Sequence, residues 1–171
     1  IDWPAIGLAL GADVPVCLSG EPTLMEGIGE RLRPLDWPTR LPAVLVNPGA
    51  PVPKTKTRDV FRVLAAKSLD ALPDYPPAPA DWPSVWQAIS DGRNDLTNAA
   101  ITVVPEITDV LDAVMRTRAV QVCRLSGAGP SAFCIYPSTE TARAAAADLM
   151  ARHPTWWVRA TSLGVAESAP L

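Results

Sequence analysis

The side chain best suited to acid–base chemistry near the start of the chain is Asp13. It is the only charged residue in the apolar and small-residue stretch LALGADVPVCLSG, residues 8–20. Removing water from an ionised carboxylate is costly, so such a group must be paired, neutralised or used. A capping or turn role is the ordinary interpretation, and a carboxylate that accepts a proton during a reaction is the functional one.

Two glycines, Gly127 and Gly129, lie in the segment SGAGPS, residues 126–131, between two apolar runs. A tight turn with positive φ would account for them. Alternatively, the backbone amides of the segment approach an anion, as in glycine-rich phosphate loops. The segment is not GxGxxG, because Ala132 stands where the third glycine would be, and the chain contains no GK[ST]. It can therefore contribute at most one part of a phosphate site.

The segment NPGAPVPKTKTRDVF, residues 47–61, joins the predicted end of a strand to the predicted start of a helix. It contains polar side chains that could meet a negatively charged substrate: Lys54, Thr55, Lys56, Thr57 and Arg58. Phe61 could stack on a ring of that substrate. The structural alternative is that Thr57 is only the N-cap of the helix and that Phe61 lies in the core.

Several other kinds of site are excluded or unsupported within these residues. The single histidine, His153, lies at the predicted end of a helix, where a cation on the helix dipole or a solvated side chain is usual. With one histidine and no clustered cysteines, we predict neither a zinc site nor a Ser-His-Asp triad, and no metal-binding residues. The segment RNDLTNAA, residues 93–100, is interpreted only as a helix start capped by Asn94 or Asp95.

Periodicity and turn residues predict the elements that must position these groups. The first 40 residues are expected to contain two or three strands without evident partners, one of them over 14–18 and two joined by a turn at 26–29. Later strands are predicted at 43–49, 120–125, 132–136 and 156–163. Helices are predicted at about 57–72, 83–90, 95–103 and 139–152, and another begins near Pro105 with one apolar face: Ile107, Val110, Leu111, Val114 and Met115.

The order of these elements predicts an α+β fold. From residue 42 it is β, several helices, β, β, α, β, which is a ferredoxin-like split βαβ unit with extra helices in its first crossover. Residues 1–40 do not belong to this cycle. We therefore expect two parts, with residues 1–40 as the tail of a preceding domain and residues 41–171 as the second domain.

Composition limits the class of protein. The 171 residues are 48% hydrophobic, and 15 Lys and Arg balance 18 Asp and Glu without a long basic run. This predicts a globular protein that binds neither nucleic acid nor a membrane surface. No apolar stretch is long enough to span a bilayer, and IDWPAIG does not resemble a leader. Three cysteines without CxxC spacing, Cys17, Cys123 and Cys134, indicate buried thiols in a reducing cytoplasm.

Taken together, the motifs resemble one family. Five segments, in this order, are similar to the C-terminal part of GHMP kinases: LGADVPVCLSG, EGIGERLRPL, VLVNPGAPVP, RNDLTNAA and RLSGAGPSAFCIY. The resemblance extends over essentially all 171 residues. It is strongest to the branch that uses ATP to phosphorylate the 2-hydroxyl of a diphosphocytidyl methylerythritol, on the non-mevalonate route to isoprenoid precursors. It implies ATP with nucleotide-bound Mg²⁺, and a GHMP C-terminal domain after the tail of a ribosomal S5 domain 2-like, ATP-binding domain.

The resemblance also implies roles for individual residues. Asp13 matches the catalytic aspartate that takes the proton from the attacking hydroxyl, a role that suits phosphoryl transfer. Gly127 and Gly129 match the third GHMP motif, which packs beside the nucleotide phosphate loop. Thr57 and Phe61 match, by their spacing of four, the threonine and aromatic residue on the substrate side. The segment between Gly49 and Phe61 is about three residues longer than in the family's pattern.

Two family features do not occur in the sequence. These are the strand with a catalytic lysine and the PxxxGLGxSSA-type loop around the ATP phosphates. We therefore expect a fragment of a longer enzyme, inactive alone because most of the electrostatic stabilisation is missing. Two alternatives stay open: another GHMP kinase with a different small alcohol as acceptor, and a non-catalytic ferredoxin-like module for binding or assembly.

Overall fold

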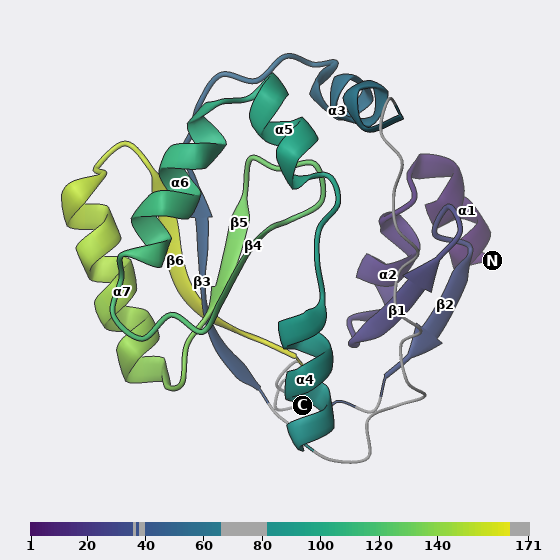
Figure 1. The fold of residues 1–171 in the computed structure, drawn as a ribbon. Helices are drawn as coiled ribbons and strands as arrows, with labels where there is room; N and C mark the ends of the chain where they lie inside the picture. The colour runs from purple at the N-terminus through teal and green to yellow at the C-terminus, as the bar shows by residue number, and fades with distance from the viewer. Residues whose placement is uncertain (36, 38–39, 66–81, 165–171) are drawn as a thin grey trace. The chain divides into compact units, whose positions relative to one another are not determined.

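A computed structural model describes residues 1–35, 37, 40–65 and 82–164 (Figure 1). The chain divides into two compact units. The first comprises Ile1–Arg40, Tyr75–Ile89 and Gly164–Leu171, and the second comprises Leu41–Asp74 and Ser90–Leu163. Each unit is described by itself.

The second unit is built on a four-stranded antiparallel sheet in the order β4-β5-β3-β6. Its strands are β3 (Leu41–Asn47), β4 (Val122–Leu125), β5 (Ala132–Ile135) and β6 (Trp157–Leu163). The order of the strands in the sheet differs from their order in the chain. Strand β5 lies between β3 and β4 and pairs with both. This order, with helical crossovers, confirms the predicted ferredoxin-like α+β fold.

Helices of this unit pack on the sheet and on one another. They are α3 (Lys56–Ala65), α5 (Thr97–Val103), α6 (Glu106–Met115) and α7 (Thr139–Arg152). Helices α6 and α7 cover the same face of the sheet (Figure 1), and their buried side chains share a core with those of β3 and β5. A second cluster joins α3, α5 and the start of α6 to Leu125 at the end of β4. A further helix, α4 (Trp82–Asp91), ends in this unit.

The sequence explains these helices well. Ser138 caps α7 in a capping box with Thr141, as expected for a helix beginning at residue 139. Its buried face is mostly alanine, which lets the helix lie close to the sheet. In α6, Ile107, Val110 and Val114 are buried as predicted, whereas Met115 is 63% exposed. The predicted helix 57–72 is confirmed over α3, and residues 66–72 lie outside the described residues.

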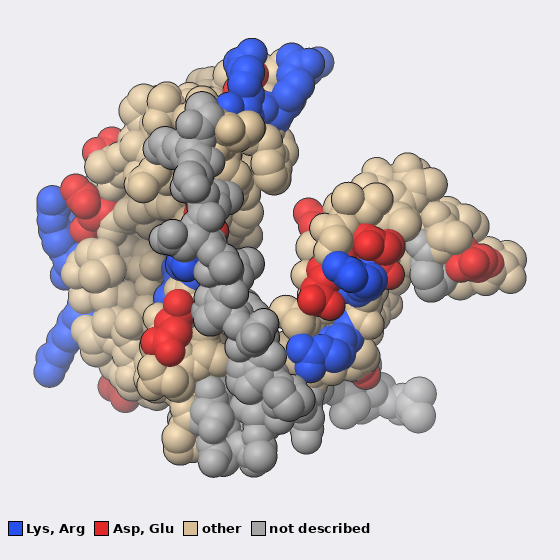
Figure 2. All heavy atoms as spheres, turned by 45° about the vertical axis from the view of Figure 1, so that its right-hand side comes forward, with Lys and Arg blue, Asp and Glu red and all other residues tan. Residues whose placement is uncertain are grey.

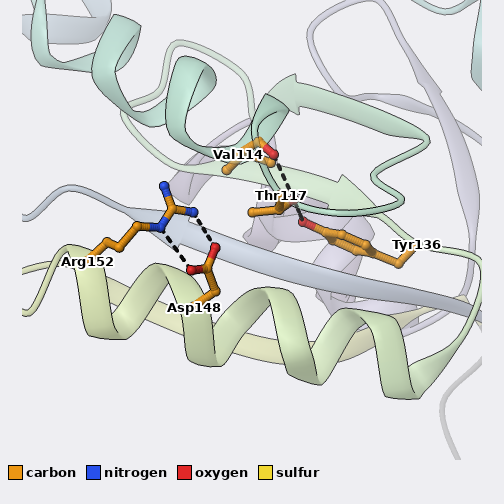
Figure 3. A network of polar contacts seen from close by, with 5 residues as sticks. All are labelled: Val114, Thr117, Tyr136, Asp148 and Arg152. Carbon is orange, nitrogen blue, oxygen red and sulfur yellow. Dashed lines mark hydrogen bonds and ion pairs between the residues drawn. The ribbon is translucent and has the colours of Figure 1, made fainter.

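Two hydrogen bonds of Thr117 lie inside the apolar core between α6 and the sheet (Figure 3). The Thr117 hydroxyl donates to the Val114 carbonyl over 2.7 Å. Its oxygen is thereby free to accept the phenol proton of Tyr136, 2.8 Å away. Burial raises the pKa of Tyr136 to about 12. The contact satisfies two hydroxyl groups that would otherwise be buried without partners.

The first unit contains two short helices and a hairpin: α1 (Trp3–Leu10), α2 (Val14–Ser19), β1 (Thr23–Glu26) and β2 (Arg31–Pro34). The hairpin confirms the predicted turn, and β1 and β2 pair with each other. The Glu30 carboxylate accepts from its own backbone amide and from the Ile28 amide (2.6 Å), and these hydrogen bonds lower its pKa. Gly29 has φ of +93°, and a Cβ there would collide with the Ala12 carbonyl. This turn therefore requires glycine.

Two predictions about the first unit are wrong. The run 14–18 is a helix, α2, and the helix α1 before it was not predicted. Both begin with proline in the first turn, where its fixed φ favours a helix, and Asp2 caps α1 through the Ala5 amide. Apolar runs this short do not distinguish a strand from a helix by periodicity.

The prediction of three buried thiols is correct only for Cys134. Cys123 is half-buried, and Cys17, which lies in helix α2 rather than in the predicted strand, is exposed. All three are free cysteines. Among the described helices, none combines the length and apolar character needed to cross a membrane.

Candidate functional site

The segment 126–131, called here the glycine loop, connects β4 to β5 in the second unit. Its ends are tied by a hydrogen bond from the Ser126 amide to the Ser131 carbonyl (2.8 Å). Inside it, the Gly129 amide donates to the Ser126 carbonyl over 2.9 Å. Gly127 and Gly129 have φ of +53° and +66°. The loop is therefore a closed turn in a left-handed backbone conformation that favours glycine.

The two glycines differ in their surroundings. A Cβ on Gly129 would lie 2.8 Å from Leu125 Cδ1 and 3.1 Å from Ile107 Cδ1, whereas a Cβ on Gly127 would meet nothing within 4 Å. Gly129 thus permits the loop to pack on the α3–α5–α6 cluster. The open side at Gly127 leaves room for another molecule to approach the backbone.

Asn94, just before α5, holds the loop by its carbonyl groups. Its side-chain amide donates to the carbonyls of Leu125 and Gly127, both at 2.8 Å. Its side-chain oxygen accepts from the Leu96 amide over 3.0 Å, which fixes the orientation of the amide group. The segment RNDLTNAA therefore has a role at this loop that the sequence did not predict, beyond starting a helix.

Lys56, in the first turn of α3, holds the same loop from another element. Its ammonium group donates to the Ala128 carbonyl over 3.1 Å and also to the Gly129 carbonyl. Burial lowers the pKa of this lysine. The side chain therefore points into the protein, and is not free to meet a substrate as the sequence suggested.

Asn47 connects the end of β3 to the loop. Its amide nitrogen donates to Ser131 Oγ over 2.9 Å, and its oxygen accepts from the Gly49 amide over 2.8 Å. Gly49 has φ of +65°, as the Pro-Gly turn requires. The segments NPG, KTKT, RND and SGAGPS, far apart in the sequence, are therefore brought together.

These contacts bind the carbonyl groups of the loop but not all of its amide groups. The carbonyls of residues 125 and 127–129 are bound by Asn94 and Lys56. The amides of Gly127 and Ala128, in contrast, donate to no acceptor in the described part of the chain. Two adjacent unbonded amides in a left-handed turn form a concavity suited to an anion such as a phosphate oxygen.

The predicted substrate-side residues lie on α3. Thr57 is exposed and Phe61, one turn later, is 52% exposed, so both lie on the same outer face. The structural alternative is therefore wrong for both: Phe61 is not in the core, and Thr57 follows the first helical residue, Lys56. Val60 is the residue that this helix buries.

Cationic side chains gather around the start of α3, at the top of Figure 2. Lys54 and Arg58 are exposed there. Arg62 is paired with Asp59 over 2.7 Å, and Asp59 also accepts from the Thr55 hydroxyl over 2.6 Å. This exposed cationic face adjoins the one occupied by Thr57 and Phe61, so an anionic ligand with a ring would find both kinds of contact on one helix.

Asp13 lies in the first unit, at the N-cap position of α2. Its side chain is exposed and makes no capping hydrogen bond. The carboxylate is therefore hydrated rather than buried, and neither a cap nor an ion pair explains it in the described structure.

His153 lies at the end of a helix, as predicted, but its ring contact was not predicted. It is the C-cap of α7, and its ring stacks on Trp156 with 3.8 Å between centroids. Within the described ranges, no three His, Cys, Asp or Glu side chains lie together as a metal site would require.

Comparisons with known proteins agree with this architecture. The family model for the C-terminal domain of GHMP kinases matches residues 81–154. A 4-diphosphocytidyl-2-C-methyl-D-erythritol kinase of Rhodopseudomonas palustris is 44% identical over 162 residues, covering 90% of this chain and 53% of the relative. The kinase of the same name from Dinoroseobacter shibae is 44% identical over 168 residues, covering 94% and 55%. The chain spans about half the length of these curated relatives.

A solved structure gives the same result. A crystal structure of 4-(cytidine 5'-diphospho)-2C-methyl-D-erythritol kinase aligns with a TM-score of 0.75 and 30% identity, covering 97% of this chain and 58% of the other. The sheet order, the convergence of motifs at the glycine loop and these relatives lead to one conclusion. Residues 81–154 match the C-terminal domain of GHMP kinases, and most of the chain is similar to kinases of that family.

Proposed function

We propose that this chain is part of a kinase that transfers the γ-phosphoryl group of ATP to the 2-hydroxyl of 4-diphosphocytidyl-2-C-methyl-D-erythritol. The enzyme would act in the cytoplasm, on the non-mevalonate route to isoprenoid precursors. The observation that carries the proposal is the glycine loop. Its Gly127 and Ala128 amides are available to an anion, whereas its carbonyls accept from Lys56 and Asn94. The names of the relatives supply the substrate.

In this proposal Asp13 is the catalytic base. The substrate hydroxyl gives its proton to the carboxylate as its oxygen bonds to the γ-phosphorus, and the bond from that phosphorus to the leaving ADP oxygen breaks. The exposed carboxylate of Asp13, without a cap or ion pair in the described structure, is available for that proton. Mg²⁺ bound to the nucleotide would neutralise charge on the phosphates.

Gly127 and Gly129 shape the nucleotide side of the site. Gly127 leaves the amide surface open, and Gly129 allows the loop to pack closely on Leu125 and Ile107. The amides of Gly127 and Ala128 would then donate to a phosphate oxygen in a fixed geometry. Such preorganised donors stabilise charge that develops on the transferred group.

Thr57 and Phe61 shape the substrate side. The exposed ring of Phe61 is suited to stack on a cytosine, and the Thr57 hydroxyl on the same face is suited to a hydrogen bond. The exposed Lys54 and Arg58 would favour a diphosphate over a neutral acceptor.

We propose further that residues 1–40 belong to the ATP-binding domain and residues 41–171 form the C-terminal domain. The hydrophobic core residues of the described chain all lie between Leu41 and Val158, whereas Ile1, Leu10 and Ile28 are more than 70% exposed. The first unit would thus complete its core with upstream residues. Those residues would also supply the lysine and the phosphate loop, as the coverage of the relatives suggests.

The test is Asp13→Asn in the enzyme that includes the upstream half. Because the carboxylate makes no described hydrogen bond, the thermal midpoint should stay within a few degrees of wild type. Turnover with ATP and the diphosphocytidyl substrate should fall by orders of magnitude. Asp2→Asn, which alters the cap of α1 in the same unit, is the matched control and should retain activity.

Three outcomes would contradict the proposal. A fully active Asp13→Asn enzyme would make this residue only structural. A strong preference of the wild-type enzyme for an alcohol without cytidine would indicate a different GHMP kinase. ATP-dependent phosphorylation by the 171-residue chain alone would show that no upstream group is needed.

A further inference from the structure

Two cysteines outside the proposed reaction lie directly opposite each other in the sheet. Cys123 in β4 pairs in register with Cys134 in β5, and their sulfur atoms are 3.2 Å apart. The hydrogen bond from Ser126 to Ser131 marks that pair as hydrogen-bonded. Because hydrogen-bonded and non-bonded pairs alternate along an antiparallel ladder, the cysteines, three positions further, form a non-hydrogen-bonded pair.

This kind of pair has the geometry that a disulfide needs. Opposite residues at non-hydrogen-bonded positions have Cα atoms about 4.5 Å apart, with their side chains closest together. Disulfides join residues whose Cα atoms are roughly 4.4–6.8 Å apart. The two sulfurs can therefore be joined by side-chain rotation, without a change in strand register.

The two thiols have different environments. The Cys134 side chain is fully buried, and its thiol donates to the sulfur of Cys123. This hydrogen bond lowers the pKa of Cys123 against the opposing effect of burial, and the nearby Arg124 lowers it further. The same contact raises the pKa of Cys134. Cys123, which is half-buried, is thus the more reactive and more accessible thiol.

We propose that Cys123 is an oxidation site for small hydroperoxides, and that Cys134 converts the oxidised sulfur into an intramolecular disulfide. The Cys123 sulfur attacks one peroxide oxygen, the O–O bond breaks, and a sulfenic acid forms while water or an alcohol leaves. The Cys134 sulfur then attacks the Cys123 sulfur, the S–O bond breaks, and water leaves with the thiol proton. Two thiols are oxidised and one peroxide is reduced.

The product would affect the proposed nucleotide site. Cys123 and Cys134 stand on the two strands that carry the glycine loop, residues 126–131. A bond between them closes a ring that contains the whole loop, which restricts its opening in the native and the unfolded chain. This modification goes beyond the proposed kinase function and does not depend on it.

The experiment uses the 171-residue chain with Cys17→Ser, which removes the exposed thiol and its cross-links between molecules. The protein is treated with hydrogen peroxide, unfolded, alkylated and digested without reduction. Mass spectrometry should then find a peptide that links Cys123 to Cys134, with the loss of two hydrogen atoms and reversal by dithiothreitol. A peroxide-treated protein whose Cys123 and Cys134 both remain alkylated would overturn the proposal.

A second variant tests the order of the steps. With Cys134→Ala in the same background, the Cys123 sulfenic acid should persist and react with dimedone. With Cys123→Ala, Cys134 should remain a thiol, because it is buried and has a raised pKa. Dimedone labelling of Cys134 rather than Cys123 would contradict the assignment. If either variant does not fold, the cross-linked peptide from the Cys17→Ser protein still decides the proposal.

Discussion

At the scale of single residues, Asn94 supports the candidate site through contacts that its residue type alone does not indicate. One amide group satisfies two carbonyls of the β4–β5 turn, at Leu125 and Gly127, while its oxygen is fixed by the Leu96 amide. A shorter side chain at this position could not reach either carbonyl. The shape of the glycine loop therefore depends on a residue more than 30 positions earlier.

We predict that Asn94→Ala destabilises the chain by about 1–3 kcal/mol, because it loses a partly buried hydrogen bond to the Leu125 carbonyl and an exposed one to the Gly127 carbonyl. Urea unfolding measures this change. Hydrogen exchange should also accelerate at the Gly129 amide, whose bond to Ser126 depends on the closed loop. Asn98→Ala is the matched control, because Asn98 is exposed on α5, and its effect should stay within about 0.5 kcal/mol. Equal effects of the two substitutions would contradict this role of Asn94.

Tyr136 gives a prediction about alkaline pH. Its folded pKa is raised to about 12 from an ordinary value of 10.0. Between these two values the unfolded chain loses the phenol proton while the folded chain keeps it, so stability falls as pH rises through the window. Urea unfolding from pH 9 to 12 measures the slope, and Tyr136→Phe should remove this part of it. An unchanged slope in the variant would exclude Tyr136 as its source.

At the scale of elements, the glycine loop shows how one motif combines two requirements. Gly129 is needed for its positive φ and because any side chain would meet Leu125 and Ile107, whereas Gly127 is needed only for its positive φ. The motif therefore contains one glycine required by conformation alone and one required by both conformation and packing.

We predict that Gly127→Ala costs about 1–2 kcal/mol, the usual penalty of a left-handed residue with a Cβ. Gly129→Ala should cost about 1–3 kcal/mol more, because the new methyl group also overpacks the cluster. The free energies of unfolding in urea give the comparison. A larger loss from Gly127→Ala would mean that the packing of Gly129 is looser than described.

The elements of the second unit were largely predictable from the sequence. Helix α7 has a capping serine and a long alanine-rich run, and α6 shows a clear apolar stripe. The short helices of the first unit could not be predicted. The apolar run 14–18 has the length of a strand, and Pro15 is equally compatible with the first turn of a helix. Hydrogen bonds over long sequence distances, such as Lys56 to Ala128, could not be predicted because local patterns carry no information about them.

At the scale of the whole molecule, the two units differ in how their stability is supported. The second has a continuous core between the sheet and helices α6 and α7. The first places several large apolar side chains at its surface, including Trp3 and Leu18. Its hairpin consists of four-residue strands, which are marginally stable without further packing. The likeness to GHMP kinases was predictable from the order of the motifs.

We predict that the two units of the 171-residue chain exchange their amide hydrogens at different rates. Amides of β3, which is paired on both sides, should be protected at least tenfold more than those of β1 and β2. Hydrogen exchange followed by NMR measures both sets in one sample. Equal protection would show that the first unit is stable without upstream residues, against the proposed domain division.

The contacts behind the glycine loop also bear on how such a motif can be transplanted or inherited. The hexapeptide SGAGPS does not determine the loop conformation alone, because Asn47, Lys56 and Asn94 from three other segments hydrogen-bond to the loop. Grafted onto a foreign hairpin, the hexapeptide would lose these supports and sample many conformations. The smallest portable unit is therefore the loop together with its three distant side chains. Recombination that separates the loop from these side chains would keep the motif in the sequence but lose the loop conformation.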